Sequence, residues 1–416
     1  MNDRQDTRPA ARAAPRGAIV LGGAHGSLET ARSLGRRGIR VWLITDDNPL
    51  AKASRYVERS FSWAGPRDDG ALAFLNELCR RHDLHGWVLF AGSDDDLRFV
   101  AQNHSALCGL FTLTTPPWET TRFASDKRQM NIRAAELGIA HPRSCYPRSA
   151  DDLSNSGLCF PVILKPSLRE GRNAFVDAKA WRADDAAALI AHYAAAKALV
   201  GSDSIMIQEL VPGDGATQYS YAAIWDRGRP IGALVAQRRR QFPVDFGLTS
   251  TFVETTDAPE VEALATRFLA SLDYSGLVEV EFKYDARDGL HKILDVNARA
   301  WTWIALGAAA GIDFPALQWQ LACGEAVVPI TRRGASWVYF PRDLAAAFHE
   351  MAAGRLTPPA YLRSLTRSSA RAVFALDDPW PAVIDIPLST GRVVMRRLFR
   401  RRRDAAATLQ SARQPL

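Results

Sequence analysis

The chain has 416 residues, of which 47% are hydrophobic and 23% charged, an ordinary composition for a globular protein with large cores. Because a chain of this length has more residues than one compact core typically holds, we expect two to four packed units. The formal net charge is +7, but arginines crowd the two ends of the chain. No aromatic–basic interleaving of the RNA-binding kind occurs, so the sequence favours no nucleic-acid partner.

The N-terminal residues 1–16 are rich in alanine, proline and arginine and lack apolar periodicity, which predicts a disordered leader without an apolar signal segment. The five cysteines form no C-x-x-C pair, and their odd number indicates free thiols in a reducing cytoplasm. The longest apolar stretch, 301–323, is interrupted by Asp313 and Pro315, which disfavours a membrane span. We therefore expect a cytoplasmic protein.

Residues 17–123 alternate between short apolar runs and helical patterns. Residues 18–22 and 39–45 predict buried strands with a helix between them. A helix over 71–82 then leads to a strand over 87–91. This alternation predicts an α/β domain with a parallel sheet covered by helices.

Polar turns follow two strands of this predicted sheet, at residues 22–27 and 93–96. Because ligands of parallel sheets bind at the carboxyl ends of the strands, Ser93 and Asp94 are candidate substrate-binding residues. Ala24 stands where the G-x-G-x-x-G pattern requires its second glycine, which disfavours NAD or FAD. The turn at 22–27 is either a structural turn or one that contacts substrate.

The pattern changes near residue 124. Further strands are predicted over 162–166, 205–210, 217–225 and 230–238, and helices over 126–137, 184–199 and 259–272. These pieces lack a simple βαβ repeat and indicate an α+β domain. We divide the chain into a leader (1–16), an α/β domain (17–123), an α+β domain (124–330) and a C-terminal extension with a basic tail (331–416).

Two predicted strands, 277–284 and 291–296, form a hairpin that carries acidic side chains. Glu281 lies on the first strand, and Asp295 and Asn297 lie at the end of the second. Pairing of the strands brings these three residues together on one face. Carboxylate and amide oxygens suit magnesium bound with nucleotide phosphates, although pairing of the acids with surface lysines or arginines is the alternative.

Two lysines stand where they can meet phosphates. Lys165 ends an apolar strand just before a proline, and Lys127 opens a helix after Asp126. A loop over 167–173 with Gly171 follows Lys165. Phosphoryl transfer depends on cations and metal around the phosphates, so the two lysines together with the acidic hairpin indicate a site for this chemistry. No Walker loop occurs, which disfavours a P-loop enzyme.

Five short motifs occur in one order over residues 120–325: Asp126-Lys127, Val162 to Pro166, Ile207 to Gly213, Val280-Glu281-Phe282, and Asp295 to Arg299. In this order and spacing they resemble the ATP-grasp superfamily. The pattern is most similar to carbamoyl-phosphate-synthase-like ATP-dependent carboligases and more distantly to amino-acid ligases such as D-aspartate ligase. The resemblance implies a parallel-sheet pre-ATP-grasp domain followed by a two-lobed ATP-grasp domain.

The resemblance also implies roles for individual residues. Lys127 and Lys165 would contact the ATP phosphates, and the loop 167–173 would close over them. Asp214 would meet the ribose. The hinge that binds adenine through its main chain would comprise Gln208, Glu209, Leu210 and Val211.

Metal binding and catalysis are implied for the acidic hairpin and its neighbours. Glu281, Asp295 and Asn297 would hold magnesium, while Arg299, with Lys165, would act in catalysis by stabilising the acyl phosphate and the tetrahedral intermediate. The last motif departs from the family's usual Glu-x-Asn-Pro-Arg because Asp295 replaces the glutamate. The shorter side chain puts a second magnesium ion in question.

Arginines at two further places have open interpretations. Arg238 and Arg240 share one face if their strand is regular, and we expect them to bind substrate or phosphate. The alternative is a solvated basic edge that discourages strand pairing, which suits Arg239 equally well. The tail over 391–408 interleaves arginines with apolar residues, and is either a solvated basic helix or a segment lying on an anionic membrane.

The function implied by the resemblance is an ATP-dependent, ADP-forming ligase that activates a carboxylate as an acyl phosphate for attack by an amine. Its cofactors would be ATP and one or two Mg²⁺ ions, which Mn²⁺ can replace, and its partners a small carboxylate and an amine. A carboxylate–thiol ligase, a carboxylase of the same fold and a non-catalytic nucleotide-binding protein are the alternatives. A homodimer is the commonest closed assembly.

Overall fold

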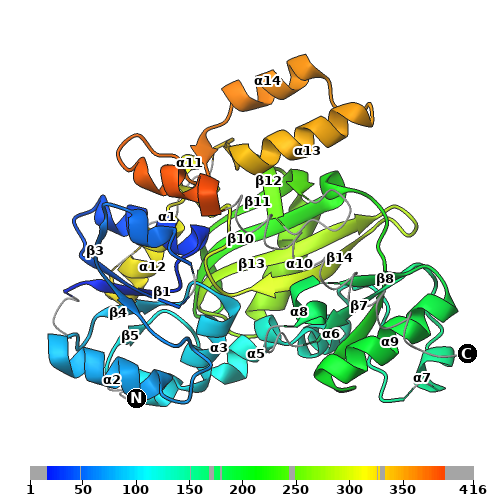
Figure 1. Cartoon of the computed structure of the whole chain (residues 1–416), viewed down its shortest axis with the longest axis horizontal. Coiled ribbons are helices and arrows are strands. Elements are labelled where there is room, and N and C mark those ends of the chain that lie inside the picture. Colours follow the sequence, from blue (N-terminus) through cyan, green and yellow to red (C-terminus); the bar gives the residue numbers. More distant parts are fainter. Residues whose placement is uncertain are drawn as a thin grey trace, which may run out of the picture.

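A computed structural model describes residues 16–46, 48–149, 151–167, 173–178, 180–242, 249–325, 327 and 333–388. Residues 1–15 of the predicted leader, residues 168–172 of the predicted phosphate loop and the basic tail lie outside the described residues, so the predictions made for them stay predictions. The described elements form three sheets with helices packed between and around them (Figure 1).

The first sheet is parallel and has the strand order β3-β2-β1-β4-β5. Its strands are β1 (Ala18–Leu21), β2 (Val41–Thr45), β3 (Val57–Ser62), β4 (Val88–Phe90) and β5 (Thr112–Leu113). The helices around it are α1 (His25–Gly35), η1 (Ala51–Ala53), α2 (Ala71–His82), α3 (Asp94–Gln102) and α4 (His104–Leu107).

Alternate residues of this sheet enter different cores, as the period of two in a strand requires. Val20 packs in one core with Leu28 and Leu34 of α1, whereas Ile19 packs in another with residues of α2 and α3. Both faces are therefore covered, which explains why β1 and β2 are buried along their whole length. The predicted parallel sheet covered by helices is confirmed.

The second sheet is antiparallel and has the order β6-β9-β7-β8. Its strands are β6 (Ser144–Cys145), β7 (Val162–Pro166), β8 (Trp181–Ala183) and β9 (Ile205–Glu209). The helices around it are α7 (Asp151–Ser154), α8 (Ala174–Ala178) and α9 (Ala186–Val200). This small lobe has its own apolar core, in which Phe175, Leu189 and Ile205 pack together.

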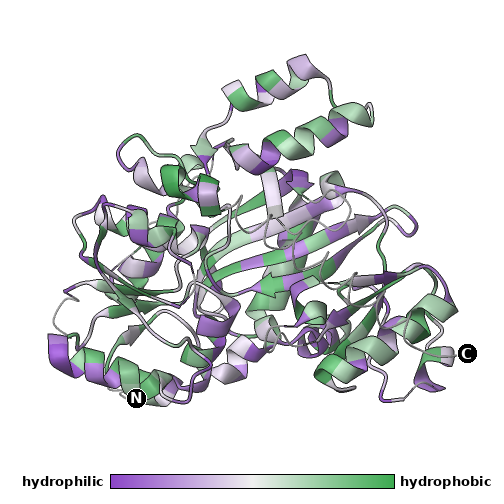
Figure 2. Ribbon diagram, viewed as in Figure 1, coloured by the Kyte–Doolittle hydropathy of each residue, from purple (hydrophilic) through white to green (hydrophobic). Residues whose placement is uncertain are grey.

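The third and largest sheet has the order β14-β13-β10-β11-β12-β15-β16. Its strands are β10 (Gln218–Asp226), β11 (Arg229–Phe242), β12 (Thr249–Thr256), β13 (Gly276–Asp285), β14 (Leu290–Asn297), β15 (Ser336–Val338) and β16 (Ala370–Arg371). Helices of this part of the chain are α5 (Trp118–Ser125), α6 (Lys127–Glu136), α10 (Pro259–Ala270), α11 (Ala305–Ala309) and α12 (Phe314–Ala322), with η2 (Gly215–Thr217) before β10. In Figure 2 its strands carry much of the hydrophobic colouring.

The chain after residue 331 first adds two strands to the large sheet and then forms helices outside the sheet. β15 pairs with β12, and β16 pairs in parallel with β15, so two strands of the predicted C-terminal extension belong to the sheet. The helices α13 (Phe340–Ala352) and α14 (Pro358–Thr366) follow, and residues 380–388 are also helical. Among the described residues, no helix combines the length and the apolar character needed to cross a membrane.

Candidate functional site

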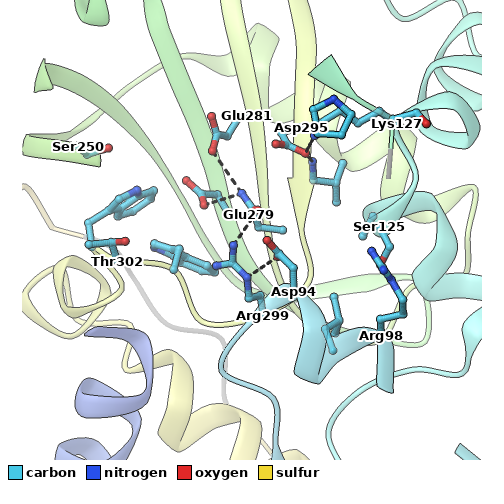
Figure 3. A pocket seen from close by; sticks show the side chains of 18 of the residues that line it. Asp94, Arg98, Ser125, Lys127, Ser250, Glu279, Glu281, Asp295, Arg299 and Thr302 are labelled. Atoms are coloured by element: carbon cyan, nitrogen blue, oxygen red, sulfur yellow. Dashed lines mark hydrogen bonds and ion pairs between the residues drawn. The ribbon is translucent and has the colours of Figure 1, made fainter. Parts of the chain in front are cut away.

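Two adjoining pockets lie where the three sheets meet. One has a volume of about 270 Å³ and the other about 170 Å³. They adjoin because the same residues line both: Lys127, Pro166, Arg238, Glu281 and Asp295. We call the larger one the acidic pocket and the smaller one the hinge pocket, and the two together the cleft. Figure 3 shows the acidic pocket.

The hairpin of β13 and β14 supplies the floor of the acidic pocket. Glu281 lies opposite Asp295, and Glu279 lies opposite Asn297, in the register of the two strands. The amide of Asn297 donates to Glu279 Oε2 at 3.1 Å and to Glu281 Oε1 at 3.3 Å. The structure thus brings together the three residues predicted to hold magnesium, and adds Glu279 beside them (Figure 3).

Glu279 is the most deeply buried acid of the cleft, with 2% of its surface exposed. Burial raises the pKa of this carboxyl to about 8, and the nearby charge of Glu281 acts in the same direction. Its Oε1 atom has no hydrogen-bond partner among the described residues. A buried oxygen without a donor is available to a ligand that enters the acidic pocket.

The predicted phosphate-binding lysines approach the cleft from two elements. Lys127 is the first residue of α6, whose N-terminus is capped by the side chain of Asp126, and its ammonium group pairs with Asp295. Lys165 extends from β7 and donates to Gln208 Oε1 at 3.2 Å. Both lysines line the hinge pocket, and Lys127 lines the acidic pocket as well.

The predicted hinge begins at the end of β9, and its four residues all line the smaller pocket. Gln208 and Glu209 are buried. The carboxylate of Glu209 accepts the main-chain N–H of Cys159 at 2.9 Å, and Arg143 lies 3.6 Å from it. The Glu209 carboxylate is therefore occupied by groups of the protein.

Arg299 closes the opposite end of the cleft. Its Nε atom donates to Asp94 Oδ1 at 2.5 Å, and another guanidinium nitrogen lies 3.5 Å from Asn297 Oδ1. Burial alone would lower the pKa of Arg299, but the charge of Asp94 and its hydrogen bond raise it above the usual range. The first domain therefore reaches into the cleft through Asp94 (Figure 3).

Ser93, the other predicted residue of this rim, does not line the cleft. Its hydroxyl caps α3 by accepting the main-chain N–H of Asp96 at 3.1 Å, and it donates to Asp96 Oδ2 at 2.5 Å. Burial raises the pKa of Asp96 to about 7, although these bonds with Ser93 lower it. Ser93 thus fixes the helix start from which Asp94 projects.

Arg238 and Arg240 are separated by a bulge, and only Arg238 lines the cleft. The pairing of β11 with β12 shifts register between these residues, so the expected common face is lost. Arg238 donates to Gln218 Oε1 at 3.1 Å and lies 3.6 Å from Glu281. Arg240 instead forms a buried bidentate ion pair with Asp343 of α13, with both distances at 2.8 Å.

Asp214, the expected ribose partner, also lies outside the residues that line the two pockets. Its carboxylate accepts the main-chain N–H of Ala216 at 2.8 Å and caps the short helix η2. The structure therefore gives Asp214 a local role in the turn before β10. The same turn is close to Lys283, whose ammonium group donates to the carbonyl of Gly213 at 2.8 Å.

Several lining residues were not among the site residues predicted from the sequence. Gln218 donates to Glu281 Oε2 at 2.6 Å, and so joins Arg238 to the acidic hairpin. The position of Glu279 two residues before Glu281 was the one available signal, because alternate residues of a strand share a face. The acidic pocket is further lined by Arg98, Ser125, Ser250, Trp301, Thr302 and Trp303.

Comparisons with known proteins find similarity in structure. No protein-family model matches the sequence, and no curated protein matches it significantly. L-amino acid ligase from Bacillus licheniformis superposes with a TM-score of 0.60 at 16% identity, over 78% of this chain and 80% of that chain. N5-carboxyaminoimidazole synthetase from Staphylococcus aureus gives 0.61 at 12% identity, over 82% and 87%.

A third similar structure is the biotin carboxylase domain dimer of 2-oxoglutarate carboxylase from Hydrogenobacter thermophilus, in complex with MgADP, ADP and bicarbonate. Its TM-score is 0.62 at 12% identity, over 78% of this chain and 74% of that chain. At these identities the likeness establishes the fold.

Proposed function

Since the chain has the ATP-grasp fold, we propose that it is an ADP-forming ligase that activates a carboxylate as an acyl phosphate and transfers the acyl group to an amine. In the first step a substrate carboxylate oxygen attacks the γ-phosphorus of ATP and ADP leaves. In the second step the amine nitrogen attacks the acyl carbon, phosphate leaves, and the amine loses a proton. No nucleophilic side chain is needed.

One observation carries the proposal: the hinge pocket and the acidic pocket form a single cleft. Gln208 to Val211 line one end, Lys165 and Lys127 follow, and Arg299 lies at the other end. This is the order that adenine, phosphates and a reacting carboxylate require. It supports ATP binding along the cleft, with the acyl group formed in the acidic pocket.

A magnesium ion fits the residues of the acidic pocket when nucleotide phosphates share it. Among the described residues, no cluster of three or more acidic, histidine or cysteine side chains is arranged to hold a metal alone. Mg²⁺ bound with phosphates needs only one or two carboxylates from the protein. Glu281, Asp295 and Asn297 would supply these oxygens, and the unpartnered Oε1 of Glu279 adds a fourth donor. Mn²⁺ has the same preferences and would substitute.

When bound, the metal would neutralise phosphate charge. The other contributions come from the chain itself. Lys127 and Lys165 balance negative charge on the phosphates, and Arg299 stabilises the oxyanion that develops as the acyl carbon is attacked. Asp94 holds the guanidinium of Arg299 in place. A group fixed before the reaction loses less entropy in the transition state.

The fold leaves the acceptor open. The similar structures include an L-amino acid ligase and carboxylases, so a carboxylate–thiol ligase or a carboxylase remains the alternative. A non-catalytic nucleotide-binding protein is a weaker alternative, because Lys127, Lys165, Glu281 and Arg299 all line the cleft. One similar structure is described as a dimer, and we propose a homodimer here on that analogy, to be checked by analytical ultracentrifugation. The cytoplasmic location stays a prediction.

The experiment is a nucleotide-product assay with purified protein and Mg-ATP. Small carboxylic acids and amino acids are paired in turn with amines, thiols and bicarbonate, and ADP, AMP and phosphate are measured. Glu281→Ala is the blank. The proposal expects ADP and phosphate release that depends on both a carboxylate and an amine and disappears in the variant. AMP release, or dependence on a thiol or bicarbonate in place of the amine, would contradict it.

A further inference from the structure

The helix α13 buries an acidic residue and exposes large apolar ones, which is the opposite of an ordinary surface helix. Its inward face buries Asp343, Ala346 and Ala347, and Asp343 forms the buried ion pair with Arg240 of the large sheet. Its outward face presents a stripe at helical spacing, consisting of Phe340, Leu344 and Phe348, with 65% of Phe348 exposed. Surface helices of globular proteins normally bury such a stripe against the core.

The last helical residues, 380–388, show the same reversal. Their inward side carries Asp385, which is buried and accepts the hydroxyl of Tyr339 at 2.7 Å. Tyr339 directly precedes α13, so this bond places the two reversed helices next to each other. The outward side and the segment before it expose Phe374, Leu376, Trp380, Val383, Ile384 and Ile386.

Most of the large exposed apolar residues among the described ones belong to this part of the chain. Elsewhere they are Ile132, Phe160, Ile190, Leu199 and Leu290, of which only Ile190 and Leu199 share an element, the helix α9. α13, α14 and the last helix form the upper edge of the molecule in Figure 1, and Figure 2 shows green segments along them. We call the exposed apolar side chains of residues 340–348 and 374–386 the apolar patch. Concentrated apolar surface of this kind marks an interaction site.

The apolar patch is held rigidly to the body of the protein. Asp378, between Leu376 and Trp380, is completely buried and accepts Arg32 Nε of α1 at 2.9 Å, the hydroxyl of Ser54 at 2.7 Å and the main-chain N–H of Arg55 at 2.9 Å. The neighbouring Asp377 forms a bidentate pair with Arg36. The patch is therefore a fixed feature of the surface, built on polar anchors.

The sequence that follows the apolar patch carries the whole excess positive charge of the protein. Residues 389–416 contain eight arginines and one aspartate, a difference of seven, and the entire chain has 52 basic and 45 acidic residues, also a difference of seven. The remaining 388 positions are thus balanced in formal charge. In the stretch 393–399, Val393 to Met395 and Leu398-Phe399 flank two of these arginines.

We propose that the apolar patch and the basic tail together attach this protein to the surface of an anionic lipid bilayer. A bilayer interface takes up apolar side chains at its acyl boundary and attracts arginines to its negative headgroups, so it satisfies both features at once. A nucleic acid would use the arginines but leave the apolar patch exposed. A second copy seated on the same patch would bring two tails of like charge together. This inference is independent of the proposed ligase activity.

The test uses the full chain and vesicle flotation. Vesicles of phosphatidylcholine alone are compared with vesicles containing about 30% phosphatidylglycerol, the second composition being chosen to give a negative surface. We expect flotation with the anionic vesicles only, and weaker binding at higher salt. The triple variant Phe348→Ser, Leu376→Ser, Trp380→Ser and the tail variant Arg400→Ser, Arg401→Ser, Arg402→Ser, Arg403→Ser should each weaken binding by at least about tenfold.

The matched control is the double variant Ile190→Ser, Leu199→Ser on α9, which removes exposed apolar side chains far from the apolar patch in sequence and should bind as the unchanged protein does. Unchanged circular dichroism and melting midpoints establish that each variant is folded. No binding to anionic vesicles would overturn the proposal. So would full binding by the triple variant, a dimer in ultracentrifugation that the triple variant dissociates, or duplex DNA binding tighter than vesicle binding.

Discussion

The arginine–carboxylate pairs of two regions of this protein differ in how completely they are enclosed. In the anchors of the C-terminal extension, Arg32 with Asp378 and Arg240 with Asp343 are at least nine-tenths buried. In the cleft, the pair of Arg299 with Asp94 leaves 21% and 43% of the two side chains exposed. The chemical groups are the same, and their surroundings decide what they do.

The enclosed pairs have their hydrogen-bonding capacity taken up by the protein. Arg32 also donates to the carbonyls of Val373 and Asp378, and Arg240 also donates to Ser364. The cleft residues face a cavity and keep room for another partner. A saturated pair therefore fixes structure, whereas an open one is available to a ligand. The following variants test this difference between enclosed and open pairs, and they are given from the largest expected effect to the smallest.

Removing one member of an enclosed pair should have the largest effect. Asp378→Ala leaves Arg32 buried without its counter-charge, and we expect a loss of about 3–5 kcal/mol in the free energy of unfolding, measured with urea. Asp377→Ala is the matched control, because its side chain is 43% exposed, and it should cost less than about 1 kcal/mol. Equal losses in the two variants would remove the distinction between enclosed and open pairs.

A change in the acidic pocket should affect turnover with little effect on stability. Glu281→Gln keeps the shape of the side chain but removes a charge from the proposed metal site. We expect ADP formation to fall by about a hundredfold or more, with the melting midpoint nearly unchanged. The control is Glu254→Gln, since Glu254 pairs with the half-exposed Arg239 on the large sheet. Full activity of Glu281→Gln would exclude the proposed role.

The two arginines beside the bulge offer a sharper contrast because they are two residues apart. Arg238→Gln should weaken apparent ATP or substrate affinity by about tenfold, since it removes one cation from the cleft. Arg240→Gln should lower the free energy of unfolding, while the protein that remains folded should have an unchanged KM. Steady-state kinetics beside urea unfolding separates the two outcomes. An exchange of these effects would mean that the register of β11 is not the one described.

The smallest effect concerns Asp96, whose pKa burial raises from 3.8 to about 7. Between about pH 4 and pH 7 the folded protein holds a proton that the unfolded chain has released, so stability falls as the pH rises through this window and then levels off. Asp96→Asn removes this contribution and should flatten the fall of stability across this window. Glu29, with its pKa also raised to about 7 by burial, contributes equally in both proteins. Unchanged slopes would contradict the shift.

Several elements could be predicted because their signals are local. The predicted helix over 71–82 has the bounds of α2, and the predicted hairpin lies within β13 and β14. Apolar alternation and turn residues decide such elements within a few positions. The same hairpin register placed Glu281 beside Asp295, as expected.

Features that depend on distant contacts could not be predicted. The bulge between Arg238 and Arg240 arises from pairing with β12, a strand that the sequence pattern did not reveal. The bond between Asp94 and Arg299 joins residues 205 positions apart. Asp214 was placed by resemblance, but its side chain is used by the turn that it begins.

The most direct test of the proposed ligase chemistry follows the oxygen atoms of the carboxylate. Substrates that support ADP release are supplied with ¹⁸O in the carboxyl group, and the released phosphate is analysed by mass spectrometry. An acyl phosphate retains one carboxylate oxygen on phosphorus when the amine displaces it, so we predict one ¹⁸O atom in each phosphate. Phosphate without the label, formed at the same rate as the product, would contradict carboxylate activation by phosphoryl transfer.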